Sequence, residues 1–202
     1  MRPRVTTTRN LYTDILRPRM SMKGIVFREF TEMVEATFGD EMMDTLIRTT
    51  DLESGGVYTT VGTYSHTELV ALVVNLAERT NIPVQDLVQA FGKYLFGRFH
   101  ALFPGFFEHD DSFSFLDSIH DVVHVEVLKL YPAAMLPDFN SEIIDEGRTL
   151  LFEYHSHRHF ADLAIGLMNG AFEFWDDHVE VTMEDKSEGD KQVILFTCRK
   201  MD

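Results

Sequence analysis

The segment FNSEIIDEGRTLLFEYHSHR, residues 139–158, marks the point where the sequence changes from helical to strand periodicity. Phe139 to Ile144 and Thr149 to Ser156 are rich in apolar and aromatic residues, and the turn sequence Asp-Glu-Gly (145–147) separates them. Two such runs around a short glycine-containing turn predict a β-hairpin.

The remaining C-terminal sequence predicts a helix and a second hairpin. Apolar residues recur at helical spacing from Phe160 to Phe174. Val179–Met183 and Val193–Thr197 then flank a Lys-Ser-Glu-Gly-Asp turn. Two hairpins and a helix indicate a lobe with a four-stranded antiparallel sheet.

The chain before this lobe, residues 22–131, is predicted to be helical. A first apolar stripe ends at Gly39, and Ser65 followed by Glu68 predicts a capping box. Pro83 suits the first turn of a further helix. The fold class is therefore α+β, with a helical N-terminal lobe followed by a C-terminal lobe that holds the four-stranded antiparallel sheet.

The length of 202 residues predicts one globular domain, residues 22–202. Residues 1–21 differ in composition, with five Arg against one Asp, and are interpreted as a disordered extension or a mis-assigned start. The net charge of −15 argues against nucleic acid as a partner, because phosphate binding requires a basic surface.

A single cysteine, Cys198, excludes an intramolecular disulfide and is typical of a reducing compartment. The sequence has no apolar run of the length that a membrane span requires, and its arginine-rich start lacks the apolar core of a secretion signal. We therefore expect a cytoplasmic protein that does not interact with membranes.

His120 and His124 are four residues apart in the predicted helix that starts at Ser112 or Ser114 and ends before Pro132. This spacing places both imidazoles on one face, where they are able to bind haem iron or zinc. A zinc site needs further ligands, and no His-Glu-x-x-His motif or cysteine pair supplies them. Histidine pairs at this spacing more often bind no metal, so the spacing by itself favours a structural pair.

Tyr154, Ser156 and Arg158 alternate along a predicted strand and so share one face. Two hydroxyls and a guanidinium can bind carboxylates, although an ordinary polar strand face has the same pattern. The opposite face would hold three histidines, which define a weaker metal-binding hypothesis with Cys198. These are His155, His157 and His159.

No catalytic motif is present: the sequence lacks a nucleophile elbow, a phosphate-binding loop and a dinucleotide-binding motif. We therefore expect no enzymatic activity.

Taken in order, these residues resemble the haem-nitric oxide/oxygen-binding (H-NOX) family, which includes the sensor domain of soluble guanylate cyclase. The similarity covers about 180 residues and starts with MKGIVF (22–27), followed by FGKYLF (91–96). His124 stands at the position of the family's proximal iron ligand, with Leu-Tyr-Pro at 130–132 and Pro137 thirteen residues after it.

This resemblance implies a haem b cofactor between the two lobes, with His124 as the proximal iron ligand. Pro137 would press on the haem and distort it, and His120 would be a structural neighbour. Tyr154, Ser156 and Arg158 match the family's propionate-binding motif. The cysteine cluster that binds structural zinc in some bacterial members cannot form with one cysteine.

The resemblance also bears on the choice of gas, because oxygen-binding members carry a tyrosine donor where this chain has Leu163. Without a donor we expect nitric oxide and carbon monoxide to bind, and oxygen to form no stable complex. The residues expected in the distal pocket are Val26, Phe30, Leu95, Phe99, Leu163 and Leu167.

The function that the resemblance implies is nitric oxide sensing. Nitric oxide binding to the ferrous haem would break the iron–His124 bond and shift the conformation. The shift would regulate a separate protein, a histidine kinase or a cyclic-di-GMP enzyme. The alternative is a haem storage or transfer protein without signalling.

Overall fold

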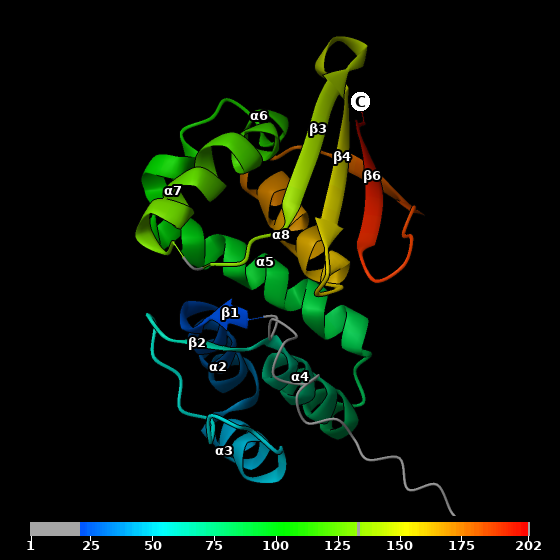
Figure 1. Cartoon of the computed structure of the whole chain (residues 1–202). Coiled ribbons are helices and arrows are strands. Elements are labelled where there is room, and N and C mark those ends of the chain that lie inside the picture. Colours follow the sequence, from blue (N-terminus) through cyan, green and yellow to red (C-terminus); the bar gives the residue numbers. More distant parts are fainter. Residues whose placement is uncertain (1–20, 133, 202) are drawn as a thin grey trace, which may run out of the picture.

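The computed structural model describes residues 21–132 and 134–201. Its N-terminal lobe contains three helices (Figure 1). These are α2 (Gly24–Phe38), α3 (Asp40–Thr49) and α4 (His66–Thr80). Their apolar faces form one core with the first half of α5 (Val84–Leu102). Gly39 follows α2 with φ of 89°, which confirms the predicted end of the first helix.

A short two-stranded sheet precedes α2 and α4, where the sequence predicted helix. Strand β1 (Ser21–Lys23) pairs antiparallel with β2 (Thr63–Ser65). The helical prediction was wrong for these residues because the loop before β2 folds over the start of α2. The Gly24 amide donates to the Gly62 carbonyl at 2.9 Å, and a Cβ on Gly24 would lie 1.9 Å from the Thr59 carbonyl oxygen.

Ser21 belongs to β1, although the sequence placed it in the N-terminal extension. Residues 1–20 of that extension lie outside the described residues.

The predicted capping box at Ser65 and Glu68 does not form. Ser65 is the N-cap of α4, but its side chain makes no capping hydrogen bond. The Glu68 side chain is buried and accepts hydrogen bonds from the Ser54 hydroxyl (2.5 Å) and the Tyr58 hydroxyl (2.9 Å). Two residues of the loop between α3 and α4 therefore supply hydrogen bonds to the Glu68 carboxylate, and the Ser65–Glu68 motif gave no indication of these contacts.

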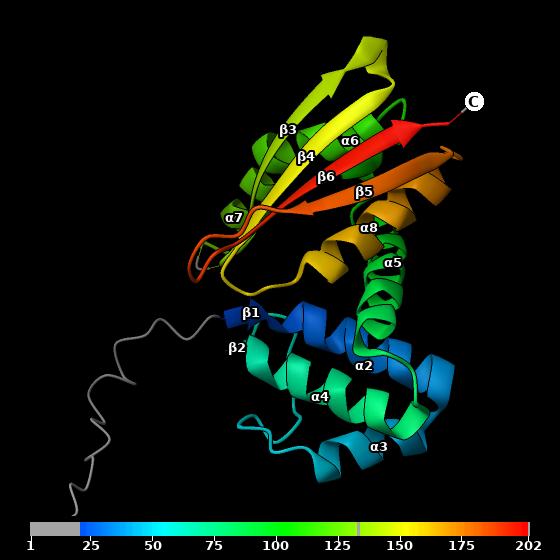
Figure 2. The same cartoon turned by 90° about the vertical axis from the view of Figure 1, so that its right-hand side faces the viewer.

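The C-terminal lobe contains the predicted four-stranded antiparallel sheet, in the order β3–β4–β6–β5. Both predicted hairpins are confirmed, as β3 (Asp138–Ile144) with β4 (Thr149–Ser156), and β5 (Val179–Asp185) with β6 (Gln192–Lys200). The turn η3 (Asp145–Gly147) joins the first pair. Helix α8 (Ala161–Phe174) covers one face of the sheet (Figure 2).

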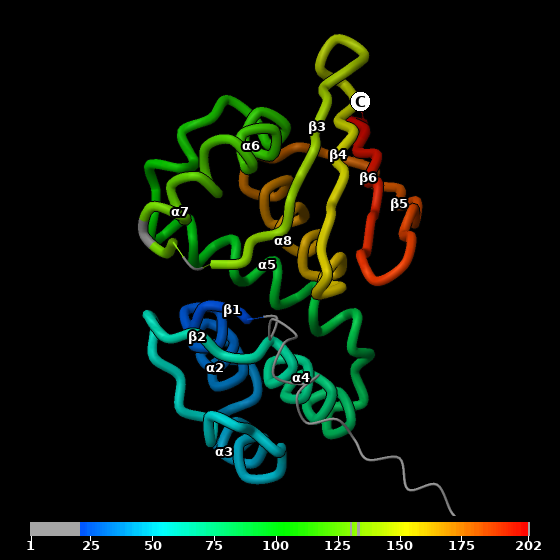
Figure 3. The backbone as a smooth tube through the Cα atoms, viewed as in Figure 1, coloured from blue at the N-terminus to red at the C-terminus, as the bar shows by residue number. Residues whose placement is uncertain are grey.

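Helices α5 and α8, far apart in sequence, cross closely and join the two lobes (Figure 3). A Cβ on Gly166 would lie 2.2 Å from the Gln89 carbonyl oxygen, and one on Gly92 would lie 2.5 Å from the Leu163 carbonyl oxygen. Only glycine permits backbones to approach this closely. The crossing therefore fixes how the helical lobe sits against the sheet lobe.

The helix predicted from about residue 112 to Pro132 is present but contains a π-helical turn. It begins as α6 (Ser112–Ser118), capped by Asp111, and follows the turn η1 (Pro104–Phe107). The π turn η2 (Ile119–Val123) leads into α7 (His124–Leu130), and the His124 amide donates to the Ile119 carbonyl. The extra residue in this turn sets the direction in which α7 presents its side chains. No helix in the described ranges is long and apolar enough to cross a membrane.

The crossing of α5 and α8 leads to the first prediction. Gly166→Ala is expected to lower the free energy of unfolding by about 2 kcal/mol or more, because the new methyl group overlaps backbone rather than a flexible side chain. Gly97→Ala is the matched control, since a Cβ there meets nothing within 4 Å. It should leave stability unchanged or raise it by about 1 kcal/mol. Urea unfolding followed by circular dichroism measures both, and equal stability of the two variants would contradict the argument.

Candidate functional site

A cavity of about 290 Å³ lies between the two lobes, and its walls are almost entirely apolar. Helices α2, α5, α7 and α8 and strands β3 and β4 contribute to it. The polar residues along its wall are Lys23, His124, Tyr131, Tyr154 and Arg158. A large apolar cavity with a few convergent polar groups is the usual form of a ligand site.

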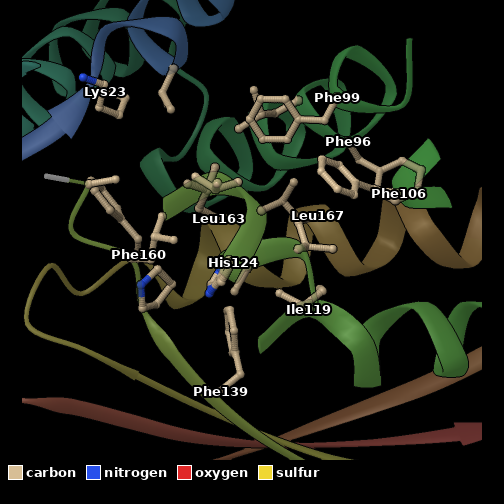
Figure 4. Close-up of a pocket in the computed structure, with 18 of the residues that line it drawn as sticks. Lys23, Phe96, Phe99, Phe106, Ile119, His124, Phe139, Phe160, Leu163 and Leu167 are labelled. Atoms are coloured by element: carbon tan, nitrogen blue, oxygen red, sulfur yellow. The ribbon is translucent and has the colours of Figure 1, made fainter. Parts of the chain in front are cut away.

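His124 is the first residue of α7, and the sequence identified it as a metal ligand. Figure 4 shows it among the lining residues, next to Phe139, whose ring centre lies 5.3 Å from that of the imidazole. Burial, with a smaller contribution from the charge of His120, lowers the pKa of His124 to about 4. The imidazole is therefore neutral at pH 7 and able to coordinate a metal ion. His120 is itself exposed.

The loop after α7 fixes the orientation of this imidazole. One ring nitrogen of His124 is hydrogen-bonded to the backbone of Pro137, which has only a carbonyl to offer, so the ring N–H donates. The other ring nitrogen therefore keeps its lone pair. This is the arrangement by which metal-binding histidines are held. Pro137 also lines the cavity.

The structure brings Tyr154, Ser156 and Arg158 together, but only Tyr154 and Arg158 line the cavity. Ser156 is buried behind them and accepts the Arg158 amide at 3.1 Å. The Tyr154 hydroxyl accepts the Phe160 amide at 3.1 Å, which leaves its own proton for an acceptor. Arg158 lies two residues beyond the end of β4 rather than within the strand. Strand alternation therefore places only Tyr154 and Ser156 on one face, and the bend after β4 brings Arg158 to the same side.

The Arg158 guanidinium is half-buried and lacks a carboxylate partner among the described residues. Its Nη1 donates to the Ser21 carbonyl at 3.2 Å. Burial lowers the pKa of Arg158, which shows that the site does not compensate the charge fully. A half-buried guanidinium facing an apolar cavity is able to donate hydrogen bonds to an anionic ligand group.

Five of the six predicted distal residues line one apolar part of the wall. They are Val26, Leu95, Phe99, Leu163 and Leu167. Phe30, the sixth, is fully buried behind this wall and packs edge-on against Phe91 at a centroid distance of 5.3 Å.

The weaker hypothesis of a metal site at His155, His157 and His159 finds no support in the geometry. The described ranges contain no group of three histidine, cysteine or acidic side chains placed to hold a metal. His155 is paired with Glu153 at 2.7 Å. Cys198 is fully buried on the opposite face of the sheet, in register with Leu150.

Sequence reasoning missed two of the polar cavity residues, Lys23 and Tyr131. Tyr131 lies seven residues after His124, so the helical period was a usable signal for it. Lys23 comes from the other lobe, and its approach to the cavity depends on the β1–β2 pairing, which the sequence did not indicate.

The cavity therefore offers a neutral, oriented imidazole, an extended apolar wall, and a guanidinium and a hydroxyl for carboxylates. A haem presents an axial iron site, a flat apolar ring and two propionates, so these residues fit it.

Comparison with known proteins agrees with this fit. A profile described as Haem-NO-binding matches residues 23–183. An H-NOX protein from K. algicida, solved as unliganded Fe(II), is 37% identical, with a TM-score of 0.81 over 90% of this chain and 97% of that one. One from S. oneidensis in the Fe(II)NO state is 29% identical, with a TM-score of 0.78 over 89% of this chain and 100% of that one. No curated protein matches the chain significantly.

The chain belongs to the haem-NO-binding (H-NOX) family. It is a domain of the haem-binding gas-sensor class, with haem as its cofactor and no catalytic role. The resemblance, the fold class and the cofactor inferred from the sequence are thereby confirmed.

The unpaired guanidinium generates the second prediction, for the haem-free protein. Arg158→Met is expected to change the free energy of unfolding by less than about 1 kcal/mol, because no buried carboxylate loses its partner. Arg98→Met is the matched comparison: Arg98 contacts the buried Glu29 at 2.5 Å, and its loss should lower the free energy of unfolding clearly more, because Glu29 then stays buried without its cation. Equal losses in chemical denaturation would mean that Arg158 has a structural role.

Proposed function

We propose that this protein is a nitric oxide sensor in which His124 holds the haem iron. The observation that supports the proposal is a buried imidazole facing a cavity in which five described residues expected on the distal side, Val26, Leu95, Phe99, Leu163 and Leu167, carry no side-chain hydrogen-bond donor. Bound haem would supply an iron atom that His124 would hold and to which a diatomic gas would bind. The protein residues determine which gas is favoured and how its binding changes the conformation.

Tyr154 and Arg158 are proposed to bind the haem propionates. The guanidinium has no competing carboxylate within the described residues, and the tyrosine hydroxyl has a proton to donate. Ser156 supports them from behind through its contact with the Arg158 amide. Pro137 is proposed to press on the haem, since it lines the cavity and its own carbonyl orients His124.

The apolar wall supports selectivity for nitric oxide and carbon monoxide over oxygen. Val26, Leu95, Phe99, Leu163 and Leu167 carry no polar side-chain atom, so no side chain of this wall can stabilise the partial negative charge of bound oxygen. The relatives are consistent with this, because the S. oneidensis protein was solved with nitric oxide and one from S. woodyi (37% identical, TM-score 0.76) with carbon monoxide. Phe30 is proposed to set the depth of the pocket from behind the wall.

The proposed signal is a displacement of α7 when His124 is released. The helix follows a π turn, a rare form that occurs mostly as a single turn within α-helices and often at functional sites, and we place the shift in this turn. Such a two-state change would regulate a separate signalling protein, a histidine kinase or a cyclic-di-GMP enzyme. We propose a cytoplasmic location for this exchange.

The third prediction tests the iron ligand. His124→Gly should bind haem weakly or not at all, and free imidazole should restore the ferrous absorption spectrum of the wild-type protein. His120→Gly is the control and should retain that spectrum, because His120 is exposed. If His124→Gly kept the wild-type spectrum without imidazole, the assignment of the ligand would be wrong.

The fourth prediction tests the apolar wall. The reduced wild-type protein should give the same spectrum anaerobically and immediately after exposure to air, and a different one with nitric oxide. Leu163→Tyr places a hydroxyl in the wall and should produce an oxygen complex in air, while Leu163→Phe keeps the bulk without the donor and should not. A stable oxygen complex of the wild-type protein would contradict the donor-free interpretation. A protein that binds haem but shows no conformational response to nitric oxide would favour haem storage.

A further inference from the structure

Strand β1 makes two contacts with the C-terminal half of the chain, and in both the partner residue lines the cavity. Its first residue, Ser21, accepts the Arg158 guanidinium at 3.2 Å. Its last residue, Lys23, places Nζ 5.0 Å from the centre of the Tyr131 ring. Because β1 pairs with β2, both contacts link the helical lobe to elements around the haem site. Figure 4 shows Lys23 at the edge of the pocket on the side of the helical lobe.

The Lys23 ammonium is held in place rather than free to move. It donates to the Val61 carbonyl at 2.7 Å and to the Thr63 hydroxyl at 3.0 Å. No carboxylate within the described ranges forms a salt bridge with it. Because both acceptors are neutral, the ammonium keeps its full positive charge and is able to attract the face of an aromatic ring. The two hydrogen bonds already order the Lys23 side chain, so its contact with the ring costs little further side-chain entropy.

Tyr131 connects this cation to the helix that carries His124. It directly follows α7, and its amide donates to the Val127 carbonyl at 2.8 Å. Tyr131 lies seven residues, about two turns, after His124, and both line the cavity with Val127. A displacement of α7 therefore moves the Tyr131 ring relative to Lys23.

We propose that the contact between Lys23 and Tyr131 is a latch that holds α7 against the helical lobe while His124 faces the cavity, and that opens when α7 moves. Both are positioning residues, because they act on His124 through α7. The proposal rests on the proposed function, in which release of His124 is the signal. It predicts that the latch biases the equilibrium between bound and released His124.

The fifth prediction measures this bias in the haem-loaded protein. Lys23→Met keeps most of the aliphatic stem and removes the charge. It should raise the ratio of released to bound His124 after addition of nitric oxide by about two- to five-fold, as expected for a cation–π contact at a partly exposed site. The absorption spectrum gives the ratio, and the iron–histidine stretching frequency of the ferrous protein should fall. Tyr131→Leu should have the same effect, whereas Tyr131→Phe, which keeps the ring, should resemble wild type.

Two controls separate the latch from other effects. In a Tyr131→Leu background, Lys23→Met should add no further change. Lys93→Met removes the same charge from the ion pair with Glu173, which joins α5 and α8 away from α7, and should leave the ratio unchanged. In the haem-free protein, Lys23→Met should also accelerate amide hydrogen exchange at residues 127–131 without lowering overall stability by a comparable factor.

The outcomes distinguish the latch from the function on which it rests. If the wild-type protein shows no histidine-ligated ferrous spectrum, the proposed function fails. If it does, but Lys23→Met and Tyr131→Leu leave the ratio and the exchange rates at their wild-type values, the latch is overturned. Loss of haem affinity in Lys23→Met with an unchanged ratio would likewise overturn it, because Lys23 would then act on the haem directly.

Discussion

The close crossing of α5 and α8 is the constraint on which the rest of the structure depends. Gly92 and Gly166 let the two backbones touch, and each lobe then packs its own apolar core on one side of this pair. Residues of both lobes line the cavity beside this crossing, from α2 and α5 on the one hand and from α7, α8, β3 and β4 on the other. Leu167 packs against both cores, so the helix that forms the crossing also provides part of the cavity wall.

The cavity is chemically prepared for its cofactor before the cofactor arrives. His124 is oriented by the Pro137 carbonyl and kept neutral by burial. Arg158 is half-buried without a carboxylate partner in the described part of the chain. The buried carboxylate of Glu29, by contrast, forms an ion pair with Arg98. A half-buried cation without a carboxylate partner reduces the stability of the haem-free fold. Binding sites commonly combine such a local loss of stability with groups that are ready to bind the ligand.

Much of the fold was predictable because local signals agreed with the tertiary structure. The two hairpins follow from alternating strands around glycine-containing turns, and Gly39 ends α2 as expected. The failures share one physical cause, which is long-range pairing that no local pattern encodes. The β1–β2 pair joins residues 40 to 44 positions apart in the sequence. The Glu68 carboxylate is hydrogen-bonded by the loop before α4 rather than by its own helix. For the site, residue types and spacing left His124 and Arg158 with other interpretations, and the resemblance to the H-NOX family singled them out. The position of Phe30 depends on packing, which neither the spacing nor the resemblance indicated.

Cys198 lies in the core of the sheet lobe, fully buried in register with Leu150, and this burial has a consequence for the selectivity of the response. Burial raises the pKa of this thiol, the only one in the sequence, to about 12. The thiolate, which is the form that reacts with oxidants and nitrosating agents, is therefore almost absent at neutral pH, and solvent does not reach the sulfur. In the folded protein Cys198 is therefore unreactive toward oxidants and nitrosating agents, and its modification does not compete with gas binding at the haem.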